Sequence, residues 1–136
     1  MQLSVDGEWH DIEAHRALLE TLFLNLIDNA WKFVPSSVRP RVTIHGRTDG
    51  ANMEITVSDN GVGIPAEAAE RVFDIFQRLH KREDYPGTGI GLSIVKKVVD
   101  VHDGEIDVRE SPDGGASFVI RLPFRHHGTA SEPLDI

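Results

Sequence analysis

The chain has 136 residues, 40% of them hydrophobic, which suits one domain with its own core and is too short for two. Its 14 Lys and Arg against 22 Asp and Glu give a net charge of −8, which argues against nucleic acid or an anionic membrane as a partner. No cysteine is present for disulfides or zinc, no apolar stretch reaches the roughly 18 residues of a membrane span, and no export signal is visible, so we expect a cytoplasmic domain without direct membrane contact.

The first half of the chain predicts a helix followed by a hairpin. Apolar residues three and four apart predict a helix over about 16–34, which Pro35 and Ser36 end. Apolar and polar residues then alternate in RVTIHGR and NMEITVSD, on either side of the turn TDGAN. This alternation predicts two antiparallel strands with one face toward solvent.

The second half predicts two more helices and a second hairpin. Helical spacing in IPAEAAERVFDIFQRL, with Pro65 in the first turn, predicts a second helix, and the polar HKREDYPGTG predicts a loop. A third helix is predicted over GLSIVKKVVDVH, ending at Gly104, and a hairpin over EIDVRE and SFVIRL around the turn SPDGG. Residues 125–136 are polar and aperiodic and are expected to form a tail without structure.

This order of elements predicts the α+β class. We expect residues 1–124 to form a two-layer α/β sandwich, in which helices cover one face of a mixed, mainly antiparallel sheet.

A polar stripe runs along the otherwise apolar first helix. Asn25, Asn29 and Lys32 are spaced by four and three residues, so they share one face. A solvated surface stripe is the simple interpretation, and Asp28 supports it. Asparagine is nevertheless a poor helix former, and amide oxygens suit magnesium while a lysine one turn further suits a phosphate. Both interpretations stay open on the spacing alone.

A carboxylate continues the apolar row of the second predicted strand. The period of two places Asp59 on the same face as Met53, Ile55 and Val57, where a buried carboxylate needs a hydrogen-bond donor. One interpretation is a turn residue bonded to nearby backbone. The other is a ligand with an N–H donor in an apolar slot, such as an adenine amino group, with Gly61 and Gly63 allowing a flat ring to come close.

Three glycines precede the third predicted helix. Gly87, Gly89 and Gly91 lie before a helix that is expected to begin at about Leu92, where free N–H groups and the helix dipole favour an anion. A flexible hinge without a ligand is the alternative. The pattern is neither a dinucleotide fingerprint, since no strand precedes it, nor a Walker loop, since no Gly-Lys-Ser/Thr follows.

Taken together, five ordered motifs resemble those of one family. NLIDNAWKF, DNGVGI, VFDIFQRL, GTGIGL and GGASFVIRLP are similar to the N box, first glycine box, F box, second glycine box and last glycine box of the sensor histidine kinase ATP-binding domain. The resemblance covers roughly residues 15–124, and the wider group includes gyrase, Hsp90 and MutL. It implies the Bergerat ATP-binding fold and the cofactors ATP and Mg²⁺.

The resemblance also implies roles for individual residues. Asp59 would accept the adenine amino group, Asn29 would hold magnesium, and Asn29, Lys32 and Arg78 would be catalytic. The expected nucleotide-binding residues are Asn25, Asn29, Lys32, Phe33, Asp59, Gly61, Gly63, Ile64, Arg78, His80, Lys81, Gly87, Thr88, Gly89, Ile90, Gly91, Leu92 and Ser117. Of these, Ser117 has a strand phase opposite to that of Phe118 and Ile120.

Two positions depart from the family pattern. His15 stands where the family usually has an aspartate before the first helix, so a helix cap is missing. The sequence His102-Asp103-Gly104 replaces the common His-Gly-Gly.

The implied activity is transfer of the ATP γ-phosphate to a histidine on a separate dimerisation and phosphoacceptor domain, with a response regulator downstream. Asn25 replaces the glutamate that activates water in the gyrase-like branch, so hydrolysis is disfavoured. Residues 78–86 would form a basic ATP lid. The alternatives are a non-catalytic nucleotide-binding module and an anti-sigma-type serine kinase of the same fold.

Overall fold

The computed structural model describes residues 2–32, 37–63, 89–111 and 114–125. Its elements in chain order are β1 (Gln2–Gly7), α1 (Arg16–Lys32), β2 (Arg41–Asp49), β3 (Asn52–Asp59), α3 (Gly89–Val101), β4 (Glu105–Glu110) and β5 (Ala116–Pro123). The helix predicted over 64–79, most of the loop predicted after it, and nearly all of the tail lie outside the described residues.

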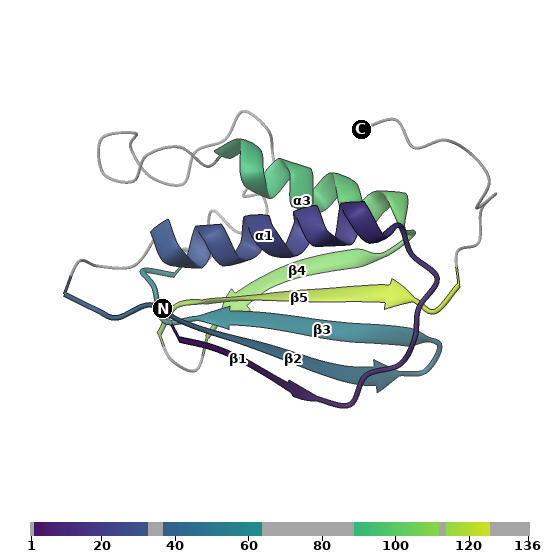
Figure 1. The fold of residues 1–136 in the computed structure, drawn as a ribbon, viewed down its shortest axis with the longest axis horizontal. Helices are drawn as coiled ribbons and strands as arrows, with labels where there is room; N and C mark the ends of the chain where they lie inside the picture. Colours follow the sequence, from purple (N-terminus) through teal and green to yellow (C-terminus); the bar gives the residue numbers. More distant parts are fainter. Residues whose placement is uncertain (1, 33–36, 64–88, 112–113, 126–136) are drawn as a thin grey trace.

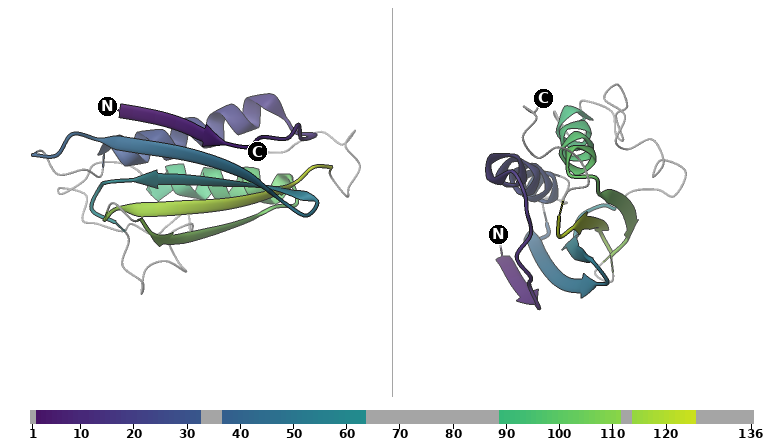
Figure 2. Two further views of the ribbon diagram at one scale, coloured as in Figure 1. Left: turned by 90° about the horizontal axis from the view of Figure 1, so that it is seen from below. Right: turned by 90° about the vertical axis from the view of Figure 1, so that its right-hand side faces the viewer.

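The strands form one mixed sheet in the order β1-β2-β3-β5-β4. The pairs β2–β3, β3–β5 and β5–β4 are antiparallel, and β1 joins β2 in parallel. Both described helices lie on the same face of this sheet (Figure 2). The predicted α+β class, with a mainly antiparallel sheet and helices on one face, is therefore confirmed.

The two predicted hairpins are present. A two-residue turn joins β2 to β3, because Asp49 pairs with Asn52, and Gly50 in that turn has a φ of +63°. Glycine adopts this left-handed conformation without the penalty that a Cβ imposes. In the second hairpin, the Ser111 N–H donates to the Gly115 carbonyl over 2.8 Å, which closes the connection between β4 and β5.

The core lies between the helices and the sheet. Leu22 and Leu26 of α1 are 1% exposed, and Val95, Val98 and Val99 of α3 are fully buried. The period of two in β3 and β5 supplies the opposite wall: Met53, Ile55, Val57, Phe118, Ile120 and Leu122. Burying this apolar surface is the main force that holds both layers together.

The outer face of the sheet is polar. Glu54 accepts two hydrogen bonds from the Arg47 guanidinium, at 2.7 and 3.1 Å, and forms an ion pair with Arg121 at 3.2 Å. The hydrogen bond from Arg47 lowers the pKa of Glu54, and this outweighs the opposing effect of burial. Alternating strands with one wet face are consistent with a sheet covered on one side only.

Strand β1 has no counterpart in the predicted elements. All six of its residues are exposed, and their side chains bury no face that would impose a pattern. It is held by parallel pairing with β2, about 39 residues away, from Gln2 with Arg41 to Gly7 with Gly46. This pairing depends on backbone hydrogen bonds between distant segments, which hydrophobic spacing does not report.

Candidate functional site

The motifs singled out in the sequence lie at one end of the molecule. The C-terminal end of α1, the N-terminal end of α3 and the carboxyl end of β3 share this end (Figure 1). Because α1 and α3 run in opposite directions, the C-terminal end of the asparagine-bearing helix and the N-terminal end of the glycine-bearing helix lie at the same end as the strand terminus at Asp59.

Asp59 is held by backbone donors on both sides. Its Oδ1 accepts a hydrogen bond from the Gly61 N–H at 2.9 Å and another from the Ala116 N–H at 3.1 Å. Burial raises the pKa of Asp59, and the two backbone hydrogen bonds only partly oppose this. Within the described residues Oδ2 has no such partner, so one oxygen of an oriented carboxylate is left for a ligand donor.

Glycine backbone surrounds this carboxylate. A Cβ added at Gly115 would overlap Asp59 Oδ1 and lie 2.6 Å from the Gly61 nitrogen, so this position accepts no side chain without a shift. Gly63 has a φ of +78°, and a Cβ there would lie 3.3 Å from the Gly114 carbonyl oxygen. The glycines therefore let the end of β3 and the start of β5 pack closely around Asp59.

Gly115 and the backbone of Ala116 are absent from the residues expected from the sequence. Ala116 is 4% exposed and supplies one of the two N–H donors to Asp59. The signal for them is the Gly114-Gly115 doublet, which marks close backbone approach at the start of a strand.

Asn29 and Asn25 differ in their surroundings although both lie on α1. Asn29 is 6% exposed, and its amide makes no hydrogen bond to any of the residues that the structure describes. Asn25 is half-buried, and its Nδ2 donates to the Thr21 carbonyl one turn earlier at 2.7 Å. A buried amide without a protein partner fits a hard cation such as Mg²⁺, whereas the amide of Asn25 is used within its own helix.

Ser117 lies on the other face of the sheet from Asp59. Its hydroxyl is 2.7 Å from that of Ser58, its neighbour across the β3–β5 pair. Phe118 and Ile120 point into the core, so the strand phase turns Ser117 away from the carboxylate. The structure gives this hydroxyl a serine partner and does not bring it to the site.

Helix α3 begins earlier than predicted. Gly89, Ile90 and Gly91 belong to its first turn, and Leu92 is 2% exposed. The N–H groups of that first turn have no partner within a helix, so they remain suited to an anion. At the other helix, α1 ends at Lys32. Seven further expected residues lie outside the described part of the chain: Phe33, Ile64, Arg78, His80, Lys81, Gly87 and Thr88.

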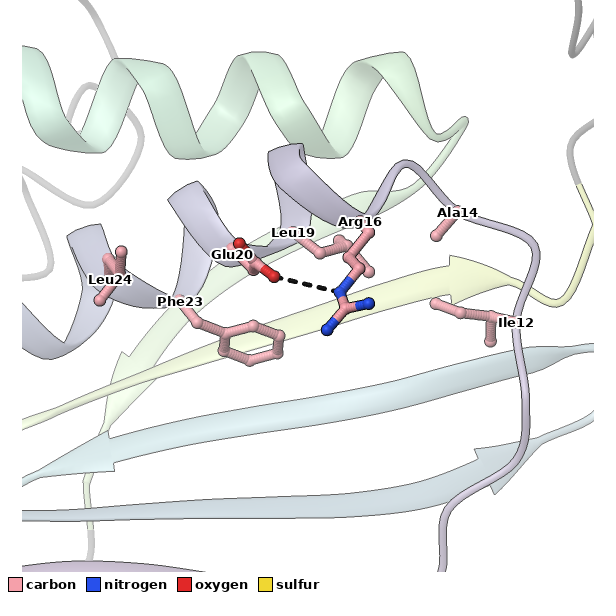
Figure 3. A pocket seen from close by; sticks show the side chains of 7 residues that line it. All are labelled: Ile12, Ala14, Arg16, Leu19, Glu20, Phe23 and Leu24. Atoms are coloured by element: carbon pink, nitrogen blue, oxygen red, sulfur yellow. Dashed lines mark hydrogen bonds and ion pairs between the residues drawn. The ribbon is translucent and has the colours of Figure 1, made fainter.

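A separate apolar pocket of about 690 Å³ lies beside the N-terminal half of α1 (Figure 3). It is lined by Ile12, Ala14, Arg16, Leu19, Glu20, Phe23 and Leu24. None of the residues around Asp59 lines it, and it faces the first turns of α1, whereas Asn29 lies in the last turns. We therefore do not assign it to the site.

The described residues contain neither a cluster of metal-binding side chains nor a membrane-spanning helix. No three His, Asp or Glu side chains gather there in a cluster fit for a metal. Neither described helix is long and apolar enough to cross a bilayer.

Comparison with known proteins identifies related chains. Residues 14–126 match the family model described as histidine kinase-, DNA gyrase B-, and HSP90-like ATPase. The phytochrome-like protein Cph1 of Synechocystis sp. is 38% identical over 118 residues, which are 87% of this chain and 16% of that protein. The sensor protein KdpD of Escherichia coli is 38% identical over 106 residues, 78% of this chain and 12% of that protein.

Solved structures agree with these sequence matches. The mycobacterial sensor histidine kinase MprB has a TM-score of 0.79 at 31% identity, over 92% of this chain and 84% of that one. Full-length ShkA in complex with AMPPNP has a TM-score of 0.75 at 25% identity, over 94% of this chain and 26% of that one. This chain spans less than a fifth of the two curated relatives. The family model covers most of the chain, and the chain therefore belongs to the histidine kinase-, DNA gyrase B-, and HSP90-like ATPases.

Proposed function

We propose that this chain is the ATP-binding catalytic domain of a sensor histidine kinase and that it is located in the cytoplasm. In this proposal it binds Mg-ATP and transfers the γ-phosphate to a histidine on a separate dimerisation and phosphoacceptor domain, from which a response regulator is phosphorylated. Curated relatives named as sensor histidine kinases, including TmoS at 41% identity, support this choice within the family.

The observation that carries the proposal is the Asp59 carboxylate. Two backbone N–H groups fix its Oδ1 and orient the group, while Oδ2 remains for an adenine amino group. An acceptor that is already oriented and desolvated favours a ligand donor over water, because no reorganisation is needed on binding.

The phosphate end of the nucleotide is assigned to the ends of the two helices. The buried amide of Asn29 would supply an oxygen to Mg²⁺, and the metal would neutralise charge on the phosphates. The first turn of α3 at Gly89–Gly91 would offer N–H groups to the phosphates, and Lys32 and Arg78 would add positive charge.

A kinase is favoured over a hydrolase by the residue one turn before Asn29. Asn25 is not a base, and its amide already donates to the Thr21 carbonyl. Water is thus not activated from this position, and the attacking group would come from an acceptor domain.

The test is phosphotransfer in trans. The purified domain is incubated with radiolabelled Mg-ATP and a separately produced dimerisation domain of a sensor kinase, with the same acceptor carrying His→Gln at its phosphorylation site as control. We expect label on the unmodified acceptor alone, stable in base and lost in acid.

The other outcomes separate the alternatives. Label that resists acid and is lost in base indicates a serine kinase. Nucleotide binding without label on any acceptor indicates a non-catalytic module.

A further inference from the structure

We propose that His102 is a positioning residue that fixes the start of α1 against the end of α3. The imidazole connects the two helices at the end of the molecule opposite Asp59. It thereby accepts the backbone N–H of the residue that precedes α1, and it sets how far α1 is displaced along α3.

Both ring nitrogens of His102 are used. The side chain is 1% exposed, its Nε2 accepts a hydrogen bond from the His15 N–H at 3.0 Å, and its Nδ1 lies 2.8 Å from the Val98 carbonyl oxygen. A carbonyl oxygen only accepts, so Nδ1 carries a proton, and a nitrogen that accepts an N–H carries none. The geometry thus requires the neutral imidazole with its proton on Nδ1.

His15 is the residue that caps α1. Its carbonyl accepts the first intrahelical hydrogen bond, from the Leu19 N–H at 3.0 Å, so His15 occupies the N-cap position. Its own N–H points to His102, 87 residues further along the chain. The two rings also meet edge to face, with centroids 5.4 Å apart. A tertiary contact therefore ties down the helix start.

The contact has a consequence at the opposite end of the helices. They run in opposite directions, and α1 spans 17 residues, or about 25 Å at 1.5 Å per residue. Leu22 and Leu26 pack with Val95, Val98 and Val99 in one core cluster, and apolar packing of this kind holds helices together without a directional bond along their axes. The His15–His102 hydrogen bond is directional. It would therefore keep Asn29 and the first turn of α3 at a constant displacement from each other along the helix axes. The importance of this displacement for Mg-ATP binding rests on the proposed function.

Two amide variants separate positioning from simple filling of space. In His102→Gln, the longer side chain places Oε1 where Nε2 lies, so the His15 N–H keeps an acceptor. In His102→Asn, the shorter side chain reaches the Val98 carbonyl and falls short of His15. Both replace the imidazole by a carboxamide, and each keeps one of its two hydrogen bonds: the Gln variant keeps the bridge to α1, and the Asn variant keeps the bond to the Val98 carbonyl.

The main measurement is amide hydrogen exchange of the first turn of α1, with Mg-ATP affinity measured beside it. We expect exchange at His15 to rise about tenfold in His102→Asn, the size of one lost hydrogen bond, and to stay near the parent value in His102→Gln. Mg-ATP affinity is expected to fall several-fold in His102→Asn only. Equal behaviour of the two variants, or a uniform rise of exchange across the core, contradicts the proposal.

Nitrogen-15 spectra of the unmodified domain give a readout independent of folding in the variants. We expect one buried histidine with its proton on Nδ1, and a proton on Nε2 of His102 overturns the proposal. If the parent domain itself binds no nucleotide, the proposed function fails, while exchange at His15 and the tautomer still decide the role of His102.

Discussion

The Asp59 carboxylate divides its two oxygens between the protein and a ligand. Oδ1 is committed to the N–H groups of Gly61 and Ala116, which belong to segments far apart in the chain. An asparagine at this position keeps an Oδ1 for both backbone donors but presents an N–H in place of Oδ2. Only the outward half of the group changes chemically.

We therefore expect Asp59→Asn to bind ATP more weakly while remaining folded. A donor facing the adenine amino group costs about 1–3 kcal/mol, which is roughly a 5- to 150-fold loss of ATP affinity. Isothermal titration calorimetry measures this loss, and Asp107→Asn, the same change at an exposed carboxylate of β4, is the matched control. Unchanged ATP affinity in Asp59→Asn contradicts the adenine assignment.

The pH dependence of unfolding follows from the same residue. Burial raises the pKa of Asp59 above its ordinary value of 3.8, so the folded state binds a proton more readily than the unfolded state. The ionised carboxylate then costs stability at neutral pH, and this cost disappears as the pH falls through the raised pKa. Glu54, with a lowered pKa, contributes stability at neutral pH that is lost in acid.

The pKa shifts of Asp59 and Glu54 change the free energy of unfolding in opposite directions as the pH falls. The informative quantity is therefore the difference in this free energy between Asp59→Asn and the parent. We expect Asp59→Asn to be at least as stable as the parent at pH 7, with an advantage that shrinks as the pH falls through the raised pKa of Asp59. Urea unfolding at a series of pH values measures it. An advantage that grows in acid contradicts the assigned direction of the pKa shift.

The two asparagines of α1 are expected to differ in how much they contribute to Mg²⁺-dependent ATP binding. Asn29 has a buried amide without a described protein partner, and the amide of Asn25 is bonded to Thr21. We expect Asn29→Ala to remove most of the gain in ATP affinity that Mg²⁺ gives, and Asn25→Ala to remove much less. Calorimetric titration of ATP with and without Mg²⁺ distinguishes them, and equal losses count against Asn29 as the ligand.

At the scale of elements, α3 ends in a Schellman motif with an unusual residue. The Gly104 N–H donates to the Val99 carbonyl at 3.0 Å and the Asp103 N–H to the Asp100 carbonyl at 3.1 Å, the two hydrogen bonds of that motif. Asp103 occupies the left-handed position with a φ of +58°, where glycine is preferred.

Replacing Asp103 by glycine is expected to stabilise the domain. Relief of the left-handed strain outweighs the added freedom of the unfolded chain, for a net gain of about 0.5–1 kcal/mol. Urea unfolding measures it, with Asp107→Gly in the interior of β4 as a control that should destabilise. Loss of stability in Asp103→Gly would mean that its side chain contributes more than the strain costs.

Periodicity predicted the elements that bury one face and missed the element that buries none. Both hairpins, α1 and α3 follow apolar spacing, while β1 is exposed on all six residues and depends on pairing with distant β2. The start of α3 at Gly89 was not predicted, because glycine weakens any helical pattern.

The candidate site likewise contains residues that local sequence patterns predict and residues that they do not. Asp59 was predicted from its phase in β3, and the phase of Ser117 already placed it on the opposite face. Gly115, the Ala116 N–H and the partner of His15 were not predicted, since each depends on a contact between distant segments.

At the scale of the whole molecule, the candidate site lies at one end of the fold, and the residues that the structure describes there include no activated nucleophile. Asn29, Asp59 and the first turn of α3 belong to one end, to which the sheet contributes a strand terminus and the helices contribute theirs. Phosphoryl transfer depends mainly on positioning and charge stabilisation, so such an end can bind ATP and still require its attacking group from elsewhere.

We therefore expect the purified domain to bind ATP and to hydrolyse it only at background rates. Asn25→Glu introduces the base that a hydrolase needs, but a carboxylate cannot donate to the Thr21 carbonyl as the amide does, so its orientation is lost and the gain in hydrolysis stays small. Phosphate release measured on the parent and on Asn25→Glu tests this, with Asp59→Asn as the control for contaminating ATPase. Turnover of about 1 per second or faster by the unmodified domain, a typical enzymatic rate, would place its chemistry with the hydrolases of the family rather than the kinases.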